Sequence, residues 1–503
     1  MTTRWETYPI EIAGGLIKNL SDINHGLKVP GSAINLINFE PSTQGGLRRI
    51  NGYEKFDTNV VPSADTATPL LGVGFFDGDV LVPREGKVYS SSGSGWTEIA
   101  TGRTQTTKTR FTIFNFDGTR KIVAVDGVNY PWTWDKSSFV NLTGSSDIQG
   151  ASHVIEFKDH LFFSKGNLVT FTVPFDETSY SVADGAGNFR VESDVTGMIV
   201  FRERLFIFSS DKIHVLDGDS VTDFSLTSVS EKIGCVRTDT IQQVSGDVAF
   251  LAADGVRLLG ATDRLGDFSN LIASSQIQAD VVDFLNSFEN YSSMVVRGKS
   301  QYRVLGTSSG LSRVNCGGYL GTQFEPQNPQ SFQWGELKEL KVYASDSQVY
   351  DGAEYIVTID AEEEYVYRME MGPDFDGEII KSSFWTPYIS FTDTLKRKTF
   401  YKVDTFIVSE SDTEGTLTLS IDQGTYKKPQ PTPQVLSSSA MPPLWDDFEW
   451  GSSDWGTGDP SSRISTVLQG SGFTASIQYD FNNSSSPFVI DTIFVEFSEE
   501  DRK

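Results

Sequence analysis

The sequence has little of the residue types that usually build metal or disulfide sites. It contains two cysteines, Cys235 and Cys316, and four histidines among 503 residues. Two cysteines cannot form a disulfide framework, and these two lack the spacing of a zinc site, so we interpret both as small buried apolar side chains. The sequence therefore predicts no metal site and no cofactor.

Several patterns of common catalytic chemistries are also missing. The sequence has no His-Glu-x-x-His, no Walker loop and no Cys-x-x-Cys. His153 and His160 are seven residues apart, which is the wrong spacing for two ligands on one strand face. Asp446 and Asp447 are adjacent, so in an extended segment they point in opposite directions and make a poor glycosidase pair. We therefore expect no catalytic residues and no enzymatic activity.

Long apolar runs and an excess of basic residues are absent as well. No stretch reaches membrane-spanning length, and the first residues, Met1 to Trp5, lack the apolar core of a signal peptide, so we expect folding in a cytoplasm. Lys and Arg number 41 against 67 Asp and Glu, a net charge of −26. Tight binding to a phosphate backbone needs clustered cations, so the charge indicates either plain solubility or a surface that DNA passes without sticking.

What the sequence does contain is a repeated pattern of short strands. Met198 to Leu216 shows it best: an apolar run ends at Phe201, two charged residues turn the chain, and an apolar run from Leu205 to Phe208 follows. Because that second run is apolar at every position, both of its faces should be buried. Similar copies follow five apolar anchors, with weaker copies after two more. The anchors are Phe76, Phe116, Phe157, Phe201 and Val244, then Val296 and Tyr350.

The spacing of these anchors predicts the fold. The first five are 40, 41, 44 and 43 residues apart. A period of about 40–50 residues with several strands in each unit is typical of a β-propeller blade. We predict an all-β chain with a propeller of six or seven blades over residues 66–385. A linear series of β-sandwiches with the same spacing is the alternative.

Residues 267–288 interrupt the repeats and contain the best helical pattern, which predicts one short helix. Apolar residues lie near one face, among them Leu271, Ile277 and Phe284. Two interpretations remain open, a helix packed on the propeller rim and a contact to a neighbouring subunit or adaptor ring.

Residues 386–503 change in character. Strict alternation in segments such as 400–408 and 415–421 predicts half-buried antiparallel strands and a small β-sandwich or barrel. Between these strands lies a segment containing Trp445, Trp450 and Trp455. We interpret the tryptophans as a contact to a neighbouring subunit, and tryptophan faces that bind sugars are the alternative.

Residues 1–65 have the pattern of an arm with several glycine turns. They contain Gly14-Gly15, Pro30-Gly31, Asn38-Phe39-Glu40-Pro41, and a Gly-Gly-x-x-Arg-x-x-Gly-Tyr segment from Gly45 to Tyr53. Arg48 and Arg49, between the glycines, could bind carboxylates of a partner or form local ion pairs. We include both, with Tyr53, among the candidate subunit contacts.

This glycine-rich pattern, together with the Trp445-Asp-x-x-x-Trp450-Gly-x-x-x-Trp455-Gly segment, resembles the tail nozzle, tail hub or stabilisation proteins of short-tailed bacteriophages. The resemblance implies a structural virion protein that assembles into a ring, a hexamer. It would extend the portal and adaptor complex, carry tail fibres or spikes, and form a channel through which DNA leaves without specific binding. Two alternatives are a tail propeller that binds a host-surface glycan or receptor and a glycan-degrading propeller enzyme.

Overall fold

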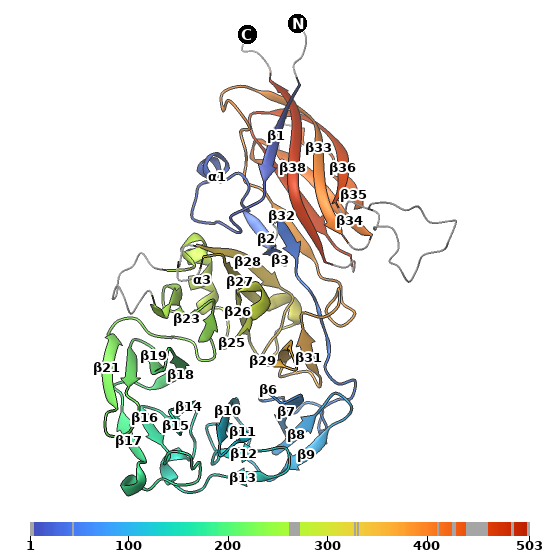
Figure 1. Ribbon diagram of the computed structural model, residues 1–503. Helices are drawn as coiled ribbons and strands as arrows, with labels where there is room; N and C mark the ends of the chain where they lie inside the picture. Colours follow the sequence, from blue (N-terminus) through green and yellow to red (C-terminus); the bar gives the residue numbers. More distant parts are fainter. Residues whose placement is uncertain are drawn as a thin grey trace.

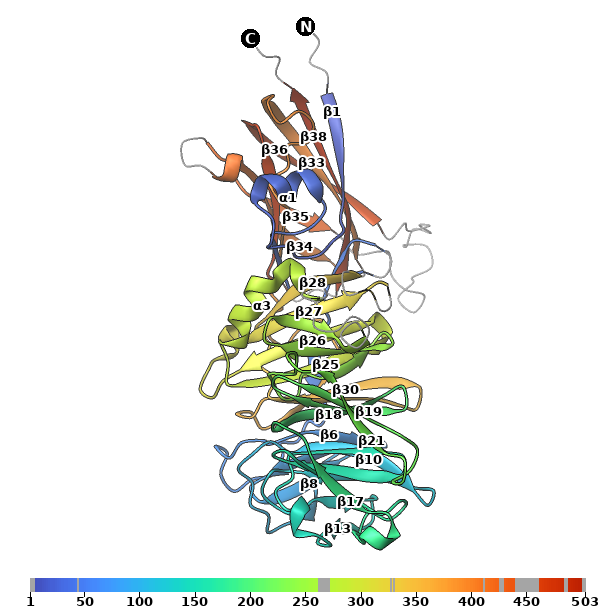
Figure 2. The same ribbon diagram turned by 90° about the vertical axis from the view of Figure 1, so that its left-hand side faces the viewer.

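The computed structural model describes residues 5–42, 45–260, 272–325, 328, 331–409, 412–424, 429–438, 461–483 and 487–499. Within these residues the chain forms a seven-bladed β-propeller and a β-sandwich stacked against one side of it (Figures 1 and 2). The predicted all-β propeller with an additional small β domain is confirmed. Among the described helices, none is both long and apolar enough to cross a membrane.

Each blade begins with its innermost strand, and the seven sequence anchors are the last residues of those strands. Blades 1 and 2 consist of β6 (Gly74–Phe76), β7 (Asp79–Arg84), β8 (Lys87–Ser91) and β9 (Thr97–Ala100), then β10 (Arg110–Phe116), β11 (Thr119–Val125), β12 (Trp132–Trp134) and β13 (Phe139–Asn141). Blades 3 and 4 consist of β14 (His153–Phe157), β15 (His160–Lys165), β16 (Leu168–Phe171) and β17 (Gly187–Arg190), then β18 (Val195–Phe201), β19 (Arg204–Ser209), β20 (Ile213–Asp217) and β21 (Ser225–Ser230).

The last three blades are less regular. In the described part of the chain, blade 5 has three strands, β22 (Gln242–Val244), β23 (Asp247–Ala252) and β24 (Gly255–Leu258). Blade 6 consists of β25 (Asn290–Val296), β26 (Gln301–Thr307), β27 (Gly317–Gln323) and β28 (Phe332–Lys338). Blade 7 consists of β29 (Ala344–Tyr350), β30 (Ala353–Ile359), β31 (Val366–Met369) and β5 (Tyr53–Lys55).

Seven apolar cores, one between each pair of neighbouring blades, close the ring. The strand β19 shows how they form: Leu205 and Ile207 pack against blade 3, whereas Phe206 and Phe208 pack against blade 5. A strand with both faces buried must be apolar at successive positions, which is the pattern seen in the sequence. The core between blades 7 and 1 completes the circle.

The propeller is closed by a strand from the N-terminal segment. β5 pairs antiparallel with β31, so that Tyr53 lies opposite Met369 and Lys55 opposite Tyr367. The outermost strand of the last blade therefore comes from the start of the chain. The N-terminal segment thus closes the propeller of its own chain.

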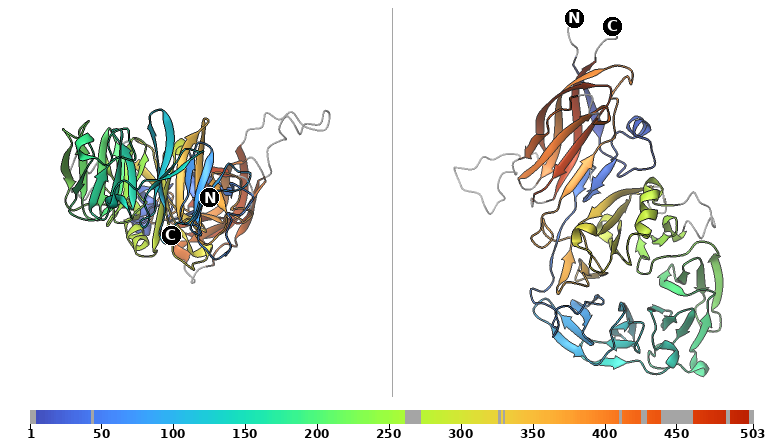
Figure 3. Two further views of the ribbon diagram at one scale, coloured as in Figure 1. Left: turned by 90° about the horizontal axis from the view of Figure 1, so that it is seen from below. Right: turned by 180° about the vertical axis from the view of Figure 1, so that it is seen from behind.

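The β-sandwich takes strands from both ends of the chain, as the views from the side and from behind show (Figures 2 and 3). One sheet contains β1 (Trp5–Glu11), β3 (Phe39–Pro41), β4 (Leu47–Arg49), β33 (Lys398–Ser409), β36 (Ser461–Gly472) and β38 (Phe488–Glu499). The other contains β2 (Asn35–Ile37), β32 (Ser382–Trp385), β34 (Thr413–Ile421), β35 (Gln434–Ser438) and β37 (Ala475–Phe481).

The second of these sheets continues into the propeller. β2 pairs with β28 of blade 6 on one edge and with β32 on the other, which gives a single nine-stranded sheet across both domains. The strands of the two domains therefore do not follow the domain boundaries predicted at residues 65 and 385. Residues 5–49 supply four sandwich strands rather than a separate arm, and β32, which precedes residue 386, belongs to the sandwich.

The helical interruption is shorter than the pattern over 267–288 predicts. Its described part consists of a 3-10 turn, Ser275–Ile277, and the helix α3 (Gln278–Leu285). A further helix, α1 (Asp22–Lys28), lies beside the sandwich and was not predicted.

Six of the seven inner hairpins turn through two residues that both have positive φ, the conformation of a type I′ turn. Four of the six have glycine in the second position, and Asp159 and Glu203 occupy it in the other two. A left-handed conformation costs a residue other than glycine about 1–2 kcal/mol. Replacing that residue by glycine removes this cost, but glycine loses about 0.5–1 kcal/mol more conformational entropy on folding, which offsets part of the gain.

We therefore expect Glu203→Gly to stabilise the protein by about 0.5–1 kcal/mol, measured as a rise in the urea midpoint. Glu203→Ala is the control, because it removes the same side chain and keeps the left-handed cost. A midpoint for the glycine variant at or below that of the alanine variant would contradict the argument.

Candidate functional site

The propeller axis holds a polar cavity of about 240 Å³. All seven blades line it with residues in their innermost strands or just before them. The lining includes two cations, Lys108 and Arg110 of blade 2, and two carboxyl groups, Asp239 of blade 5 and Asp346 of blade 7. His153 of blade 3 also lies on the wall.

Ion pairs cross this cavity between blades 2 and 5. Arg110 binds Asp239 through two contacts, Nε to Oδ1 at 2.5 Å and Nη2 to Oδ2 at 3.0 Å. Lys108 Nζ lies 3.0 Å from the same Oδ2 and donates to the backbone oxygen of Tyr291 at 3.2 Å. One carboxylate is thus held between two cations in a position that joins blades across the axis.

The charges of these groups follow from burial and from one another. Burial alone would raise the pKa of Asp239, but the positive charges of Arg110 and Lys108 outweigh it and hold that pKa far below its usual range. Burial, reinforced by Arg110, lowers the pKa of His153 to about 3, so its ring is neutral at physiological pH. Burial also raises the pKa of Asp346.

The polar groups of this cavity hold blades 2 and 5 together, and the cavity does not form a channel for another molecule. The cavity is far too small for a nucleic acid duplex, and its strongest charges bind one another. Nowhere in the described residues do histidine, cysteine, aspartate and glutamate gather in a group able to hold a metal ion.

One catalytic pattern does occur in the sequence, and the structure accounts for it. Gly306 to Gly310 has the Gly-x-Ser-x-Gly pattern, which in hydrolases presents a serine nucleophile between a strand and a helix. Here it begins in the last two residues of β26 and leads into a turn and a loop. Ser308 Oγ accepts a hydrogen bond from the backbone nitrogen of Glu289 at 3.0 Å, and no histidine among the described residues binds it.

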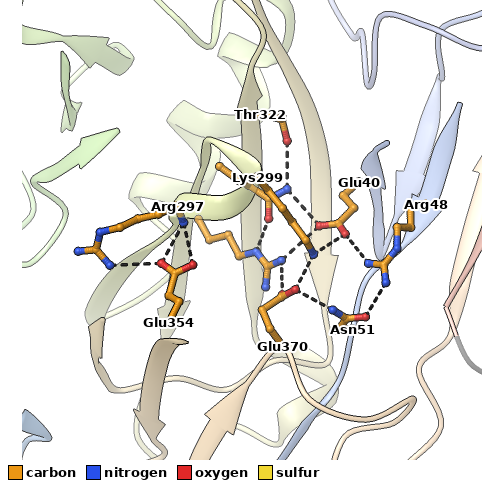
Figure 4. A network of polar contacts seen from close by, with 10 residues as sticks. Glu40, Arg48, Asn51, Arg297, Lys299, Thr322, Glu354 and Glu370 are labelled. Carbon is orange, nitrogen blue, oxygen red and sulfur yellow. Dashed lines mark hydrogen bonds and ion pairs between the residues drawn. The ribbon is translucent and has the colours of Figure 1, made fainter. Parts of the chain in front are cut away.

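A second buried polar cluster lies where the propeller meets the sandwich (Figure 4). Glu40 of β3, which is 1% exposed, contacts three cations. The contacts are Arg48 Nη1 at 2.9 Å, Lys299 Nζ at 2.6 Å and Arg303 Nη2 at 3.3 Å. We call Glu40, Arg48, Lys299, Arg303 and Glu370 the junction cluster.

Glu370 is the second carboxylate of the junction cluster. It lies 2.5 Å from both Lys299 and Arg303, and it accepts a hydrogen bond from Asn51 at 2.9 Å. Burial would raise the pKa of Glu370, but Arg303 and Lys299 outweigh it and lower that pKa to about 2. Blade 6, the segment after blade 7 and the sandwich strands β3 and β4 therefore share one network of charges.

Three predicted contact residues lie at this junction and interact within their own chain. Arg48 belongs to the junction cluster. Arg49 is buried and donates from Nη2 to the backbone oxygens of Ile380 and Asn483 at 3.0 and 2.7 Å. Tyr53 stacks on Phe375 at 5.1 Å and accepts a hydrogen bond from Arg313.

The helical candidates also pack inside the chain. Ile277 and Phe284 are buried in the core shared by blades 5 and 6 and the sandwich. Phe284 meets Tyr291 and Tyr319 edge to face. This packing matches the first of the two interpretations, a helix on the propeller rim. Leu271, Trp445, Trp450 and Trp455 lie outside the described residues.

Sequence reasoning did not find Asp239, Arg110, Lys299, Arg303 or Glu370. The partners are 129 residues apart for Arg110 and Asp239 and more than 250 apart for Glu40 and Arg303, and neither pair has a local signature. Glu40 belongs to the Asn38-Phe39-Glu40-Pro41 motif. The one feature that could have indicated its role is that it is a charged residue in a strand that is otherwise buried.

Asp239→Asn should destabilise the protein by about 3–5 kcal/mol, because it leaves two buried cations without a full counter-charge. Asp217→Asn is the matched control. Asp217 pairs with Arg204 at 3.0 Å on the surface, where such pairs contribute about 0–1 kcal/mol. Denaturant unfolding of both variants checks this, and equal losses would contradict it.

Glu40→Gln should likewise cost about 3–5 kcal/mol, since Lys299 and Arg303 would then share Glu370 alone and Arg48 would lose its carboxylate partner. Glu354→Gln, which removes a more exposed neighbouring pair with Arg297 (Figure 4), should cost about 1 kcal/mol or less. Unfolding in urea compares the two variants. A loss for Glu40→Gln no larger than that for Glu354→Gln would show that the cluster does not join the domains energetically.

The depressed pKa of Glu370 makes part of the stability pH-dependent. A carboxylate with a lowered folded-state pKa stabilises the protein above its unfolded pKa, about 4.3, and this stability is lost as the pH falls toward about 2. We expect the unfolding free energy to fall over this window, and to fall less steeply in Glu370→Gln. Parallel pH profiles for the two proteins would contradict the assignment.

Comparisons with known proteins bear on the fold alone. No family model and no curated protein matches the sequence. Matching solved structures include BBS1N in complex with ARL6DN (TM-score 0.39, 12% identity, 64% of this chain and 97% of that one) and the Neurospora crassa Pan2 WD40 domain (0.38, 11%, 65% and 98%). Another is a chain of the Mitotic Checkpoint Complex (0.39, 10%, 64% and 94%). The sheet order and the seven inter-blade cores define the propeller without them.

Proposed function

We propose that this protein is a structural subunit of a ring in the tail of a short-tailed bacteriophage, the nozzle or hub that extends the portal and adaptor complex. The observation that carries the proposal is where the residues of the sequence resemblance lie. The described residues of that resemblance all belong to its N-terminal pattern, and several of them lie near the junction between propeller and sandwich, in positions where few other residues fit.

The glycines of the pattern lie at close backbone approaches. A Cβ added at Gly15, which has φ +63°, would lie 2.7 Å from the backbone oxygen of Trp334 in β28. An added Cβ at Gly46 would overlap the backbone oxygen of Ile490 in β38, and one at Gly52 would overlap that of Asp374. Each of these glycines allows an N-terminal segment to lie directly against a strand or loop of another part of the chain.

The polar residues of the pattern lie at the same junction. Asn38 has φ +54°, donates to the backbone oxygens of Lys338 and Lys381, and accepts from the backbone nitrogen of Lys338. Glu40 is the centre of the junction cluster, and Arg49 is buried beside it. The pattern thus specifies how a propeller and a sandwich are joined, which supports extending the resemblance from a motif to the two-domain architecture.

Charge and chemistry fit a conduit part better than an enzyme or a nucleic-acid receptor. A net charge of −26 disfavours strong binding of DNA, which leaves a passing duplex free to move. Because the propeller axis is blocked by the Asp239 ion pairs, the DNA channel of the proposed ring would have to lie between subunits, with acidic residues facing it.

The proposal predicts that the purified protein, alone or added to its portal and adaptor, forms closed rings visible by electron microscopy. In virions, a label on this protein should lie on the tail axis, and a label away from the axis would contradict the proposal. Binding to duplex DNA at low salt should be no tighter than micromolar, and nanomolar binding would argue against the channel.

A further inference from the structure

A groove of about 520 Å³ lies on one face of the propeller where blades 7, 1 and 2 meet. Tyr350 enters it from the end of β29, Gly78 from the turn after β6, Lys136 from the turn after β12 and Arg368 from β31. Its size is that of a small-molecule site, for which roughly 300–1,000 Å³ is usual. It is separate from both the axial cavity and the junction cluster.

Arg368 is the unusual residue of this groove. Its guanidinium lies 3.9 Å from the ring centroid of Tyr355, whose ring is itself stacked on Phe75 at 4.8 Å. Its guanidinium makes no hydrogen bond and no ion pair with any described residue, although Glu54 is its cross-strand neighbour. A guanidinium stacked on a ring is held in place while its N–H groups remain available for a planar anion.

Tyr350 supplies an aromatic surface beside it. Its side chain is 39% exposed, and it meets Phe75 and Tyr355 edge to face at 6.0 and 6.3 Å. Gly78 lies against the ring, because a Cβ added there would be 3.0 Å from Tyr350 Cε1. These contacts fix the ring in an orientation that leaves part of it open to solvent.

The other charges of the groove already have partners, with one exception. Asp77 pairs with Arg120, Asp79 with Lys136 at 3.2 Å, and Lys55 with Asp376 at 3.1 Å. Glu54 is exposed and lines the same groove. The cation without a counter-charge is therefore Arg368, and Glu54 is the group that would oppose an acidic ligand.

We propose that this groove binds a saccharide that carries a carboxylate, with the carboxylate on the guanidinium of Arg368 and the apolar face of the sugar ring on Tyr350. A bidentate guanidinium selects a planar carboxylate, and an exposed aromatic ring next to it selects a pyranose face. One free cation in the groove is too little for a nucleic acid. This inference goes beyond the proposed ring and does not depend on it.

The test titrates the full-length protein with sodium glucuronate and, separately, with glucose, by calorimetry and saturation-transfer NMR. One ion pair and one stacked ring should give affinity of about millimolar for glucuronate, and glucose should bind at least tenfold more weakly. The proposal would be overturned if the two sugars bound equally, or if glucuronate did not bind at a concentration of about 20 mM, which is 20 times the expected dissociation constant.

Variants locate the site. Arg368→Gln should weaken glucuronate binding at least tenfold, and Tyr350→Ala should weaken it as well. Glu54→Gln should tighten it by removing a repulsion. Arg204→Gln, which removes an exposed arginine in blade 4, is the control and should leave affinity unchanged.

Two further measurements keep the outcome clear. Melting temperatures show whether each variant folds. If Arg368→Gln does not fold, Arg368→Lys, which keeps the charge but loses the planar fork, is measured in its place. It should still lose most of the affinity. Triglutamate is the last probe, and binding as tight as that of glucuronate would assign the groove to acidic peptides and overturn the sugar assignment.

Discussion

The pairing of β5 with β31 is the contact on which the rest of the architecture depends. Each blade has two apolar faces, so no blade is stable without a neighbour on both sides, and the circle has to close. The strand that completes blade 7 comes from residues 53–55, which lie next to the sandwich strands β1 to β4 in sequence. Closing the propeller therefore also fixes where the sandwich lies.

The junction cluster has a different physical role from the apolar cores. Burying Glu40 and Arg303 and partly burying the other three charged groups costs desolvation free energy, and replacing a buried ion pair by apolar residues is often neutral or stabilising. What charges provide is geometry: Glu40 meets Arg48, Lys299 and Arg303 in one arrangement only, whereas apolar side chains tolerate sliding. We therefore interpret the junction cluster as the feature that sets the register between β3, blade 6 and the segment after blade 7. The ion pairs of Asp239 on the propeller axis act in the same way between blades 2 and 5.

The repeated elements could be predicted from the sequence, because their signals are local. Each inner hairpin has an apolar anchor, a two-residue turn and an apolar run, and these lie within about fifteen residues of one another. The run Leu205 to Phe208 is apolar throughout since its alternate residues face two different blades. The N-terminal strands could not be recognised in this way, because β2, β3, β4 and β5 have three residues each. Apart from the pairing of β3 with β4, their partners are hundreds of residues away. The other charged partners of Glu40, Lys299 and Arg303, and those of Asp239 were hidden for the same reason.

The predicted domain boundary at residue 385 separates β32 from the sandwich strand β37, with which it pairs. β32 ends at Trp385, yet it pairs with β37 on one side and with β2 on the other, inside the nine-stranded sheet. Between β28 and β2, however, this sheet has a single residue pair, Ile37 opposite Glu336, so the backbone alone is a narrow connection between propeller and sandwich. The junction cluster and the apolar core shared by blades 5 and 6 and the sandwich supply the other contacts that hold one domain against the other.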